Sequence, residues 1–215
     1  EAKKRGSGYL NVALFGVDSR DNDLDKGTRS DTIMIASLNK KTMKVKIASI
    51  YRDTLSEQED GTLNKINAAY SYGGPEGALS VLNKNLDMNI EHYVTVNFNS
   101  MIDIVDSVGG IDIDVQEDEM PYICGYVQEI MKVTGKLSPG VTEPGTQTLN
   151  GVQATAYARI RYTAGDDFKT CRKAAGGFYR KVVEKLQQAS PAQLNKIIDK
   201  VFPEVSTNFT NDRNP

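Results

Sequence analysis

The chain has 215 residues, of which 39% are hydrophobic and 25% are charged, and its formal net charge is −2. This composition is that of an ordinary soluble globular protein and excludes collagen, coiled coils and intrinsic disorder, and the length favours a single domain over residues 1–215. Because the net charge is slightly negative, a general basic surface for nucleic acid is also excluded, and any anion site must come from local clusters of Lys and Arg.

Three apolar runs near the N-terminus predict strands. Residues 9–17 (YLNVALFGV) are almost continuously apolar and predict a buried central strand that ends just before Asp18. Residues 32–38 and 44–51 are joined by the short segment NKKTM and predict an antiparallel hairpin. The polar, acidic residues 56–62 then predict a loop.

Helices and strands alternate in the middle of the chain. Residues 66–72 and 75–86 predict helices, with Pro75 placed in the first turn of the second one. Residues 92–98 alternate as a strand does, residues 100–108 have helical spacing, and the segment GGIDIDV predicts a further strand. This alternation favours an α/β fold with a layered sheet.

The C-terminal part is mostly helical after an excursion rich in Pro and Gly. The elements that we expect there are an insertion over about 116–148, a helix capped by Asn150 and ending at Ala158, an extended segment over 158–163, and helices over 169–188 and about 190–202. Ser190, Pro191 and Gln193 form a capping-box pattern at the start of the last helix. The domain core then spans about residues 9–188.

Cysteine and histidine are too rare for several kinds of site. Cys124, Cys171 and His92 are the only residues of these types, which disfavours zinc-finger ligation and Ser-His-Asp catalysis. No apolar run reaches 18 residues, and the sequence begins EAKKR without Met. We therefore expect an excised part of a longer protein whose membrane anchor lies outside this sequence.

Two aspartates lie close to the predicted strands. Asp18 follows the first strand, where open α/β sheets place ligand sites, and Asp31 stands two residues after Arg29. Two carboxylates completed by substrate phosphate oxygens and water suit Mg²⁺, so we expect Asp18 and Asp31 to share this ion when such a substrate is bound. The alternative is that Asp18 caps a loop and Arg29 pairs with Asp31 on the surface.

Three further groups of cationic residues predict an anion site. Arg52 follows a predicted strand, Arg159 and Arg161 share one face of an extended segment, and a third group lies at a helix start. That third group consists of Lys169, Arg172 and Lys173. Arginine binds phosphate well because its planar donors form two parallel hydrogen bonds. Each group alone is typical of a solvated surface, but together they favour recognition of an anion.

Seven segments occur in the order found in the LytR-CpsA-Psr domain and cover roughly residues 10–186: GVDSR, TRSDTIM, SIYRDT, KINAAYSYGGPEGA, VDSVGGIDIDV, LNGVQATAYARIR and DDFKTCRK. The chain therefore resembles this family of bacterial cell-envelope enzymes. The resemblance implies a three-layer α/β/α sandwich around a central mixed sheet, a Mg²⁺ requirement, and an N-terminal membrane helix. It also implies transfer of a glycopolymer-1-phosphate, such as teichoic acid or capsule, from a polyprenyl pyrophosphate carrier to a cell-wall acceptor such as peptidoglycan. This reaction takes place at the extracytoplasmic face of the cell membrane.

The resemblance assigns roles to individual residues. Asp18 and Asp31 match the metal-associated aspartates, and the pyrophosphate-binding arginines are matched by Arg29, Arg52, Arg159 and Arg161. The closing family motif is matched by Asp166 and Arg172, while Lys169 replaces an Arg, Lys173 replaces a Gln, and Tyr51 replaces a Pro in the earlier SIPRDT motif. Lysine keeps the charge of arginine but loses its two-pronged geometry. Asp53 and Asp166 are the candidates for the general base, and the alternative is that each forms a salt bridge with a neighbouring arginine.

Two other functions stay open at this point: hydrolysis of the polyprenyl pyrophosphate, and non-catalytic binding of prenyl-linked wall polymers. We also expect an apolar pocket for the prenyl chain, with candidate walls at Leu79, Leu82, Leu86, Ile102 and Val105. An oxidising extracytoplasmic location and an even cysteine count favour a disulfide between Cys124 and Cys171. The alternative is a pair of buried thiols.

Overall fold

The computed structural model describes residues 8–18, 24, 27–160 and 178–210. Its contacts divide the chain into two compact units. The first, here called the sheet unit, comprises residues 1–97 and 205–215, and the second, the helical unit, comprises residues 98–204. The single domain expected over residues 1–215 stays a prediction.

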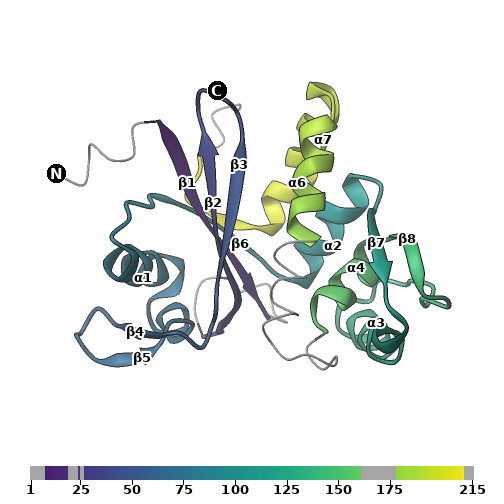
Figure 1. The fold of residues 1–215 in the computed structure, drawn as a ribbon, viewed down its shortest axis with the longest axis horizontal. Helices are drawn as coiled ribbons and strands as arrows, with labels where there is room; N and C mark the ends of the chain where they lie inside the picture. The colour runs from purple at the N-terminus through teal and green to yellow at the C-terminus, as the bar shows by residue number, and fades with distance from the viewer. Residues whose placement is uncertain (1–7, 19–23, 25–26, 161–177, 211–215) are drawn as a thin grey trace. The chain divides into compact units, whose positions relative to one another are not determined.

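The sheet unit is built on five strands in the order β3-β2-β1-β6-β9. Their bounds are β1 Tyr9–Val17, β2 Ser30–Asn39, β3 Val45–Ile50, β6 His92–Val96 and β9 Ser206–Thr207. Figure 1 labels β1, β2, β3 and β6 of this sheet. β1 pairs parallel with β6, whereas the other neighbours pair antiparallel. The sheet is therefore mixed, which confirms the predicted α/β class, and the predicted hairpin over 32–38 and 44–51 is confirmed as β2 and β3.

The core of the sheet unit follows from strand alternation. Ala13, Phe15 and Val17 of β1 are each at most 3% exposed, because every second side chain of a strand points to the same face. They pack in one cluster with Tyr70 and Leu82 of helix α1 (Ala68–Leu86), so this helix covers that face of the sheet. Tyr70 lies edge-on to Phe15, with ring centroids 5.2 Å apart.

Helix α1 has a kink where the sequence predicts two helices. Gly74 has φ 63° and ψ −159°, a conformation that essentially only glycine adopts, and Pro75 then begins the second helical segment. Of residues 56–62, expected as a loop, 58–62 form the connection between β4 (Leu55–Glu57) and β5 (Leu63–Lys65), while Ser56 and Glu57 belong to β4. Three residues per strand give too short an alternation to reveal a strand in the sequence.

In the helical unit, helices pack around a two-stranded antiparallel sheet. The elements are α2 Phe98–Ser107, β7 Ile111–Val115, η2 Glu117–Glu119, α3 Met120–Thr134, β8 Gly145–Leu149, α4 Gly151–Ala158, α6 Tyr179–Gln188, α7 Pro191–Val201 and η4 Phe202–Glu204. Asn150 and Ser190 cap α4 and α7 with capping boxes, as the sequence predicts. Among the residues described, none of the helices is both long and apolar enough to span a membrane.

One expectation for this unit gains detail and another needs revision. The predicted insertion over about 116–148 contains helix α3, whose Ile123, Val127 and Ile130 are buried, and its status as an insertion stays a prediction. The extended segment expected from Ala158 is wrong at its start, because Ala158 ends α4 and Arg159 continues with helical angles of φ −87° and ψ −11°. The capping box at Asn150 starts a helix whose last turn includes these residues. Residues 161–163 and the first part of the helix expected over 169–188 lie outside the described residues.

Candidate functional site

A β-bulge places Asp31 at the end of the central strand pair. Gly16 pairs with Thr32 and Val17 pairs with Ser30, so Asp31 is the extra residue between two paired positions. A bulge bends its strand and turns the side chain of the extra residue away from the regular alternation. Asp18 directly follows Val17 and is exposed. Both aspartates therefore lie at the same end of β1 and β2.

Arg52 connects Asp31 to a second carboxylate. Its Nη1 donates a hydrogen bond of 2.7 Å to Asp31 Oδ1, and its Nε lies 3.5 Å from Asp53 Oδ2. Lys65 Nζ in turn donates to Asp53 Oδ1 at 2.5 Å. These contacts make a row of side chains with alternating charge, here called the Arg52 network, which consists of Asp31, Arg52, Asp53 and Lys65. Since its side chains are 44–57% exposed, water and ligands reach these charges.

Backbone hydrogen bonds hold the turn that carries Arg52. Thr54 N donates to Tyr51 O at 3.0 Å, which closes the turn. Ile66 N donates to Thr54 O at 2.8 Å and Asn67 N donates to Arg52 O at 3.2 Å, which ties the turn to the start of α1. The guanidinium thus projects from a fixed backbone, which favours binding because little order is lost when a ligand arrives.

The charges in the network reinforce one another. The hydrogen bond from Lys65 lowers the pKa of Asp53, and the nearby charges of Lys65 and Arg52 act in the same direction against a small effect of burial. Burial would lower the pKa of Arg52, but Asp31 and Asp53 outweigh it and raise the pKa. A carboxylate held in this way is a weaker proton acceptor than an ordinary aspartate. In the structure Asp53 is a salt-bridge partner, one of the two roles that the sequence left open for it.

The helical unit holds a second arginine with an unused donor. The Arg159 guanidinium lies 4.9 Å from the ring centroids of both Phe98 and Tyr126, and its Nη2 donates to Glu129 Oε1 at 3.2 Å. Its Nη1 is buried and has no hydrogen-bond partner among the described residues. A buried guanidinium N–H without a partner calls for an acceptor, and phosphate oxygens suit it.

The structure brings some of the predicted site residues into contact, and others lie outside the described residues. It joins Asp31 to Arg52 and places the exposed Arg29 two residues from Asp31. The predicted fork of Arg159 and Arg161 is not supported, because Arg159 follows α4 with helical angles rather than lying on a strand. Arg161, Asp166, Lys169, Arg172 and Lys173 lie outside the described residues.

Sequence reasoning missed two partners. Lys65 begins the KINAAYSYGGPEGA segment, so the signal for it was present in the chain, but nothing in the spacing links it to Asp53. Glu129, which pairs with Arg159, lies on α3, and the expected insertion gave no reason to look there.

The donor atoms at the end of β1 and β2 fit the predicted Mg²⁺ site. Asp18 and Asp31 supply carboxylate oxygens, the ligand type that Mg²⁺ prefers, and two carboxylates with phosphate oxygens and water are a usual set for this ion. Within the part of the chain that the structure describes, no group of three or more His, Cys, Asp or Glu side chains could hold a metal ion. Among the described residues the predicted site therefore has Asp18 and Asp31 as its two carboxylates, a set suited to an ion that also binds substrate oxygens and water.

The other expectations for side chains have mixed outcomes. Cys124 is a free thiol whose Sγ donates to Val141 O at 3.3 Å. Its expected disulfide partner, Cys171, lies outside the described residues. Of the five candidate walls of a prenyl pocket, all are buried except Leu86, which is 39% exposed. Leu79 and Leu82 belong to the core of the sheet unit. The prenyl pocket itself stays a prediction.

Comparisons with known proteins identify close relatives over nearly the whole chain. Residues 2–214 match the model of the LytR_cpsA_psr family. Polyisoprenyl-teichoic acid–peptidoglycan teichoic acid transferase TagV of Bacillus subtilis is 32% identical over 206 residues, which cover 93% of this chain and 50% of TagV. Biofilm regulatory protein A of Streptococcus mutans is 30% identical over 210 residues, with the same coverages of 93% and 50%.

A solved structure supports the same relationship. The crystal structure of B. subtilis TagV matches with a TM-score of 0.73 and 29% identity, covering 95% of this chain and 76% of the TagV chain. This similarity agrees with the predicted α/β fold around a mixed sheet. The chain spans about half the length of the two relatives matched by sequence.

Proposed function

Because this chain belongs to the LytR-CpsA-Psr family, we propose that it is a phosphotransferase of the cell envelope. It would move a glycopolymer-1-phosphate from a polyprenyl pyrophosphate carrier to a cell-wall acceptor such as peptidoglycan. The observation that carries the proposal is the Arg52 network, in which an arginine at a strand end lies between two aspartates. The name of the TagV relative, a teichoic acid transferase acting on peptidoglycan, supports the same class of reaction.

In the proposed reaction an acceptor hydroxyl oxygen attacks the phosphorus that carries the sugar. The bond between this phosphorus and the bridging oxygen of the pyrophosphate breaks, polyprenyl phosphate leaves, and the hydroxyl proton passes to a base or to water. Negative charge grows on the phosphate oxygens during this step, so positioned cations lower the barrier. Arg52 would hold the pyrophosphate by exchanging one of its carboxylate contacts for phosphate oxygens.

We propose further that Asp18 and Asp31 hold Mg²⁺ together with the pyrophosphate. Bound there, the ion would neutralise charge on the phosphate oxygens. Arg159 is the candidate in the helical unit for a further phosphate contact, because its buried Nη1 lacks a partner among the described residues. An N-terminal membrane anchor and an extracytoplasmic location are part of the same proposal.

The test is a transfer assay with a polyprenyl-pyrophosphate-linked polymer, peptidoglycan and Mg²⁺. We expect polymer bound to peptidoglycan and an equal amount of polyprenyl phosphate, and a loss of about 100- to 1,000-fold in Arg52→Ala, as for removal of a charge-stabilising donor. Arg180→Ala is the matched control, because Arg180 pairs only with Glu184 on the surface of α6 among the described residues.

Other outcomes would favour the other functions. Release of polyprenyl phosphate at the same rate without peptidoglycan would mean hydrolysis. Binding of the carrier-linked polymer without any product would mean a non-catalytic binder. Transfer that persists in excess chelator would remove the proposed role of Mg²⁺.

A further inference from the structure

A polar groove lies in the sheet unit between helix α1 and the segment that joins β4 to β5. It has a volume of about 370 Å³, within the range of roughly 300–1,000 Å³ that small-molecule sites occupy. Gln58, Glu59, Asp60 and Asn64 line it from the hairpin, and Tyr72 belongs to its helix wall. This space is called the hairpin groove below.

Small residues of α1 create the hollow. Ala69, Gly73 and Gly77, which have small side chains or none, line the groove on both sides of the kink at Gly74. A Cβ added at Gly73 would meet nothing within 4 Å, so the space above this residue is open. Gly73 is also not among the glycines with positive φ, so a larger side chain is sterically allowed there.

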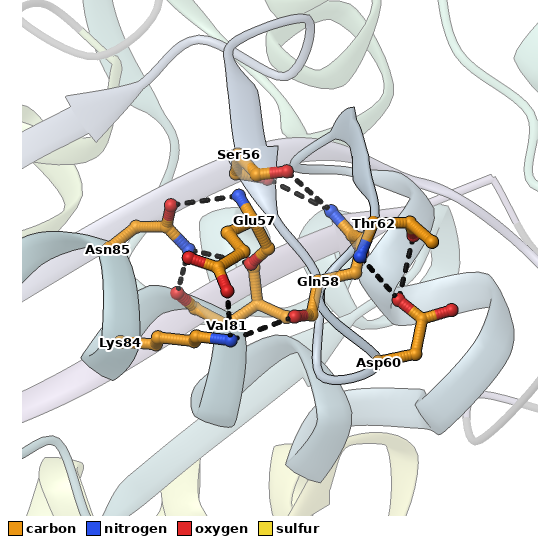
Figure 2. A network of polar contacts seen from close by, with 8 residues as sticks. All are labelled: Ser56, Glu57, Gln58, Asp60, Thr62, Val81, Lys84 and Asn85. Atoms are coloured by element: carbon orange, nitrogen blue, oxygen red, sulfur yellow. Dashed lines mark hydrogen bonds and ion pairs between the residues drawn. The ribbon is translucent and has the colours of Figure 1, made fainter.

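The hairpin groove is held in a fixed shape by hydrogen bonds between the hairpin and α1 (Figure 2). Asn85 accepts from Glu57 N at 3.0 Å and donates to Glu57 O at 2.9 Å, as a partner strand would. Lys84 Nζ donates to Gln58 O at 3.1 Å and pairs with Glu57 Oε1 at 2.8 Å. The Gln58 side chain is itself buried and donates to Ser56 Oγ at 3.0 Å. A groove with walls fixed in this way loses little order when a ligand binds.

The lining favours an uncharged sugar over an anionic polymer. None of the side chains that line the groove in the described part of the chain is Lys or Arg, whereas Glu59 and Asp60 both line it. Two carboxylates repel a phosphate-rich ligand but accept hydrogen bonds from sugar hydroxyl and amide groups. Tyr72, which is 73% exposed, offers a flat apolar ring with a polar tip, a combination suited to the C–H face and the hydroxyl groups of a pyranose.

Part of this hydrogen-bonding capacity is not used by the residues that the structure describes. The Glu59 carboxylate and the Tyr72 hydroxyl make no hydrogen bond to any residue that the structure describes, whereas Asp60 Oδ1 already accepts from Thr62 N at 2.9 Å. The groove thus combines an exposed aromatic ring with hydrogen-bond acceptors that have no partner among the described residues. The network of Figure 2 keeps its walls in place. Such a combination is typical of a ligand-binding site.

We propose that the hairpin groove binds an uncharged saccharide and that it holds the acceptor glycan, an assignment that rests on the proposed transferase function. Continuity with the Arg52 network supports the acceptor role. Asn64 lines the groove, and the next residue of β5, Lys65, pairs with Asp53 beside Arg52. The hairpin that lines the groove therefore also contributes Lys65 to the Arg52 network, in which Arg52 is proposed to hold the phosphate.

The test measures saccharide binding to the chain without any lipid donor, so its result does not depend on transfer. The probe is a β-1,4-linked N-acetylglucosamine oligosaccharide, followed by ligand-observed NMR and titration calorimetry. We expect binding to the unmodified chain, its loss in Gly73→Leu, which fills the groove, and affinity reduced about two- to tenfold in Tyr72→Ala, the value of one aromatic contact. Gly125→Leu on α3 is the matched control, since a Cβ there also meets nothing within 4 Å.

Three results would overturn the proposal. The first is no binding of the oligosaccharide to the unmodified chain. The second is unchanged binding in Gly73→Leu when its circular dichroism and melting temperature match those of Gly125→Leu. The third is tighter binding of a glycerol-phosphate oligomer than of the uncharged sugar in the same groove, read from the effect of Gly73→Leu. If the sugar binds as expected but the transfer assay gives no product, the saccharide site is supported and the proposed transferase function is contradicted.

Discussion

Arg52 contacts Asp31 and Asp53 through two different nitrogen atoms, and a lysine cannot reproduce this arrangement. Nη1 donates to one carboxylate at 2.7 Å while Nε lies 3.5 Å from the other. The ammonium of lysine is a single point of charge on a flexible stem. We expect Arg52→Lys to lower the rate of transfer at least about tenfold, which corresponds to roughly 1.4 kcal/mol of transition-state stabilisation.

The same substitution is expected to leave stability almost unchanged. The side chains of Arg52 and Asp31 are 46% and 44% exposed, and exposed ion pairs contribute only about 0–1 kcal/mol. Urea denaturation of Arg52→Lys checks this, with Arg180→Lys as the control. A variant that unfolds much more easily than the control would show that Arg52 acts through the fold.

Gly151 and Gly125 make a matched pair for stability, because both lie in helices but only one is crowded. A Cβ added at Gly151 would lie 2.3 Å from Ile102 O and 2.8 Å from Ile102 Cα, so the backbones of α4 and α2 would have to separate. We expect Gly151→Ala to destabilise the protein by about 1–3 kcal/mol or more. A Cβ added at Gly125 meets no atom within 4 Å, so we expect Gly125→Ala to stabilise the protein by up to about 1 kcal/mol. Thermal unfolding compares the two directly, and equal effects would contradict the close packing at Gly151.

Sequence reasoning at this scale found single site residues but not their partners. Asp31 and Arg52 were predicted because each lies near the end of an apolar run, a local signal. The bulge that turns Asp31, and the pairing of Asp53 with Lys65, depend on strand register and on the β4–β5 hairpin. These are tertiary properties that residue spacing along the chain does not encode.

Among the elements, α1 depends on one glycine more than on its helix propensity. Gly74 combines φ 63° with ψ −159°, and Pro75 restarts the helix. A side chain at this conformation costs about 1–3 kcal/mol. We expect Gly74→Ala to destabilise the sheet unit by that amount, measured by urea denaturation, while Gly73→Ala at the neighbouring position has a much smaller effect. If both variants lose a similar free energy of unfolding, the destabilisation comes from crowding at the kink and not from the backbone conformation of Gly74.

Helix α7 is attached to α2 partly through charge. Asp103 of α2 is 8% exposed and lies 2.5 Å from Lys136 Nζ and 2.9 Å from Lys200 Nζ of α7. Burial would raise the pKa of Asp103, but the hydrogen bonds from Lys136 and Lys200 outweigh it and lower the pKa. Asp103 thus contributes stability above the carboxyl pKa of the unfolded chain, about 3.9, and this contribution is lost as the pH falls through the lower folded value.

We therefore expect Asp103→Asn to destabilise the protein at pH 7 by about 1–3 kcal/mol, the cost of leaving hydrogen-bonding groups without their charged partner. The difference from the unmodified chain should be smaller at pH 3, because below about 3.9 the unfolded chain takes up the proton and the contribution of Asp103 to stability is being lost. Urea denaturation at both pH values measures it, and Asp199→Asn on the exposed face of α7 is the control. A difference that is the same at both pH values would contradict the ion pair.

Elements with long, regular patterns could be predicted, and short or composite ones could not. The strand over 9–17 and the caps at Asn150 and Ser190 match the structure residue by residue. Helix α3 was missed because the prolines and glycines around it resemble a loop, although its buried residues repeat at helical intervals. The sequence predicts Arg159 on a strand because apolar and charged residues alternate in ARIRYT. The structure instead continues the preceding helix as far as this residue.

At the scale of the whole molecule, the sheet unit is completed by residues from the end of the chain. After the helical unit, β9 returns to pair with β6, so Val94 faces Thr207 and Thr95 faces Ser206. Asn208 Nδ2 donates to Glu91 O at 2.7 Å, and its Oδ1 accepts from Tyr93 N at 3.1 Å. The ring of Phe209 stacks on His92, with centroids 4.4 Å apart. This edge of β6 is therefore covered by a segment that follows the helical unit in the sequence.

Removing that segment should weaken the sheet unit although every other strand remains. Truncation after Glu204 deletes β9, Asn208 and Phe209 and leaves the β6 edge without these partners. With a net value of about 1 kcal/mol for each lost hydrogen bond, we expect a destabilisation of about 2–4 kcal/mol. Hydrogen exchange should become faster at Tyr93 and Thr95 first, and the open edge should promote self-association, because unpaired strands pair with other chains. Truncation after Thr210 keeps all of these contacts and is the control. If the two truncated chains unfold at the same urea concentration and exchange β6 amides at the same rate, β9 is only an appendage, and the sheet unit is complete by Asn97.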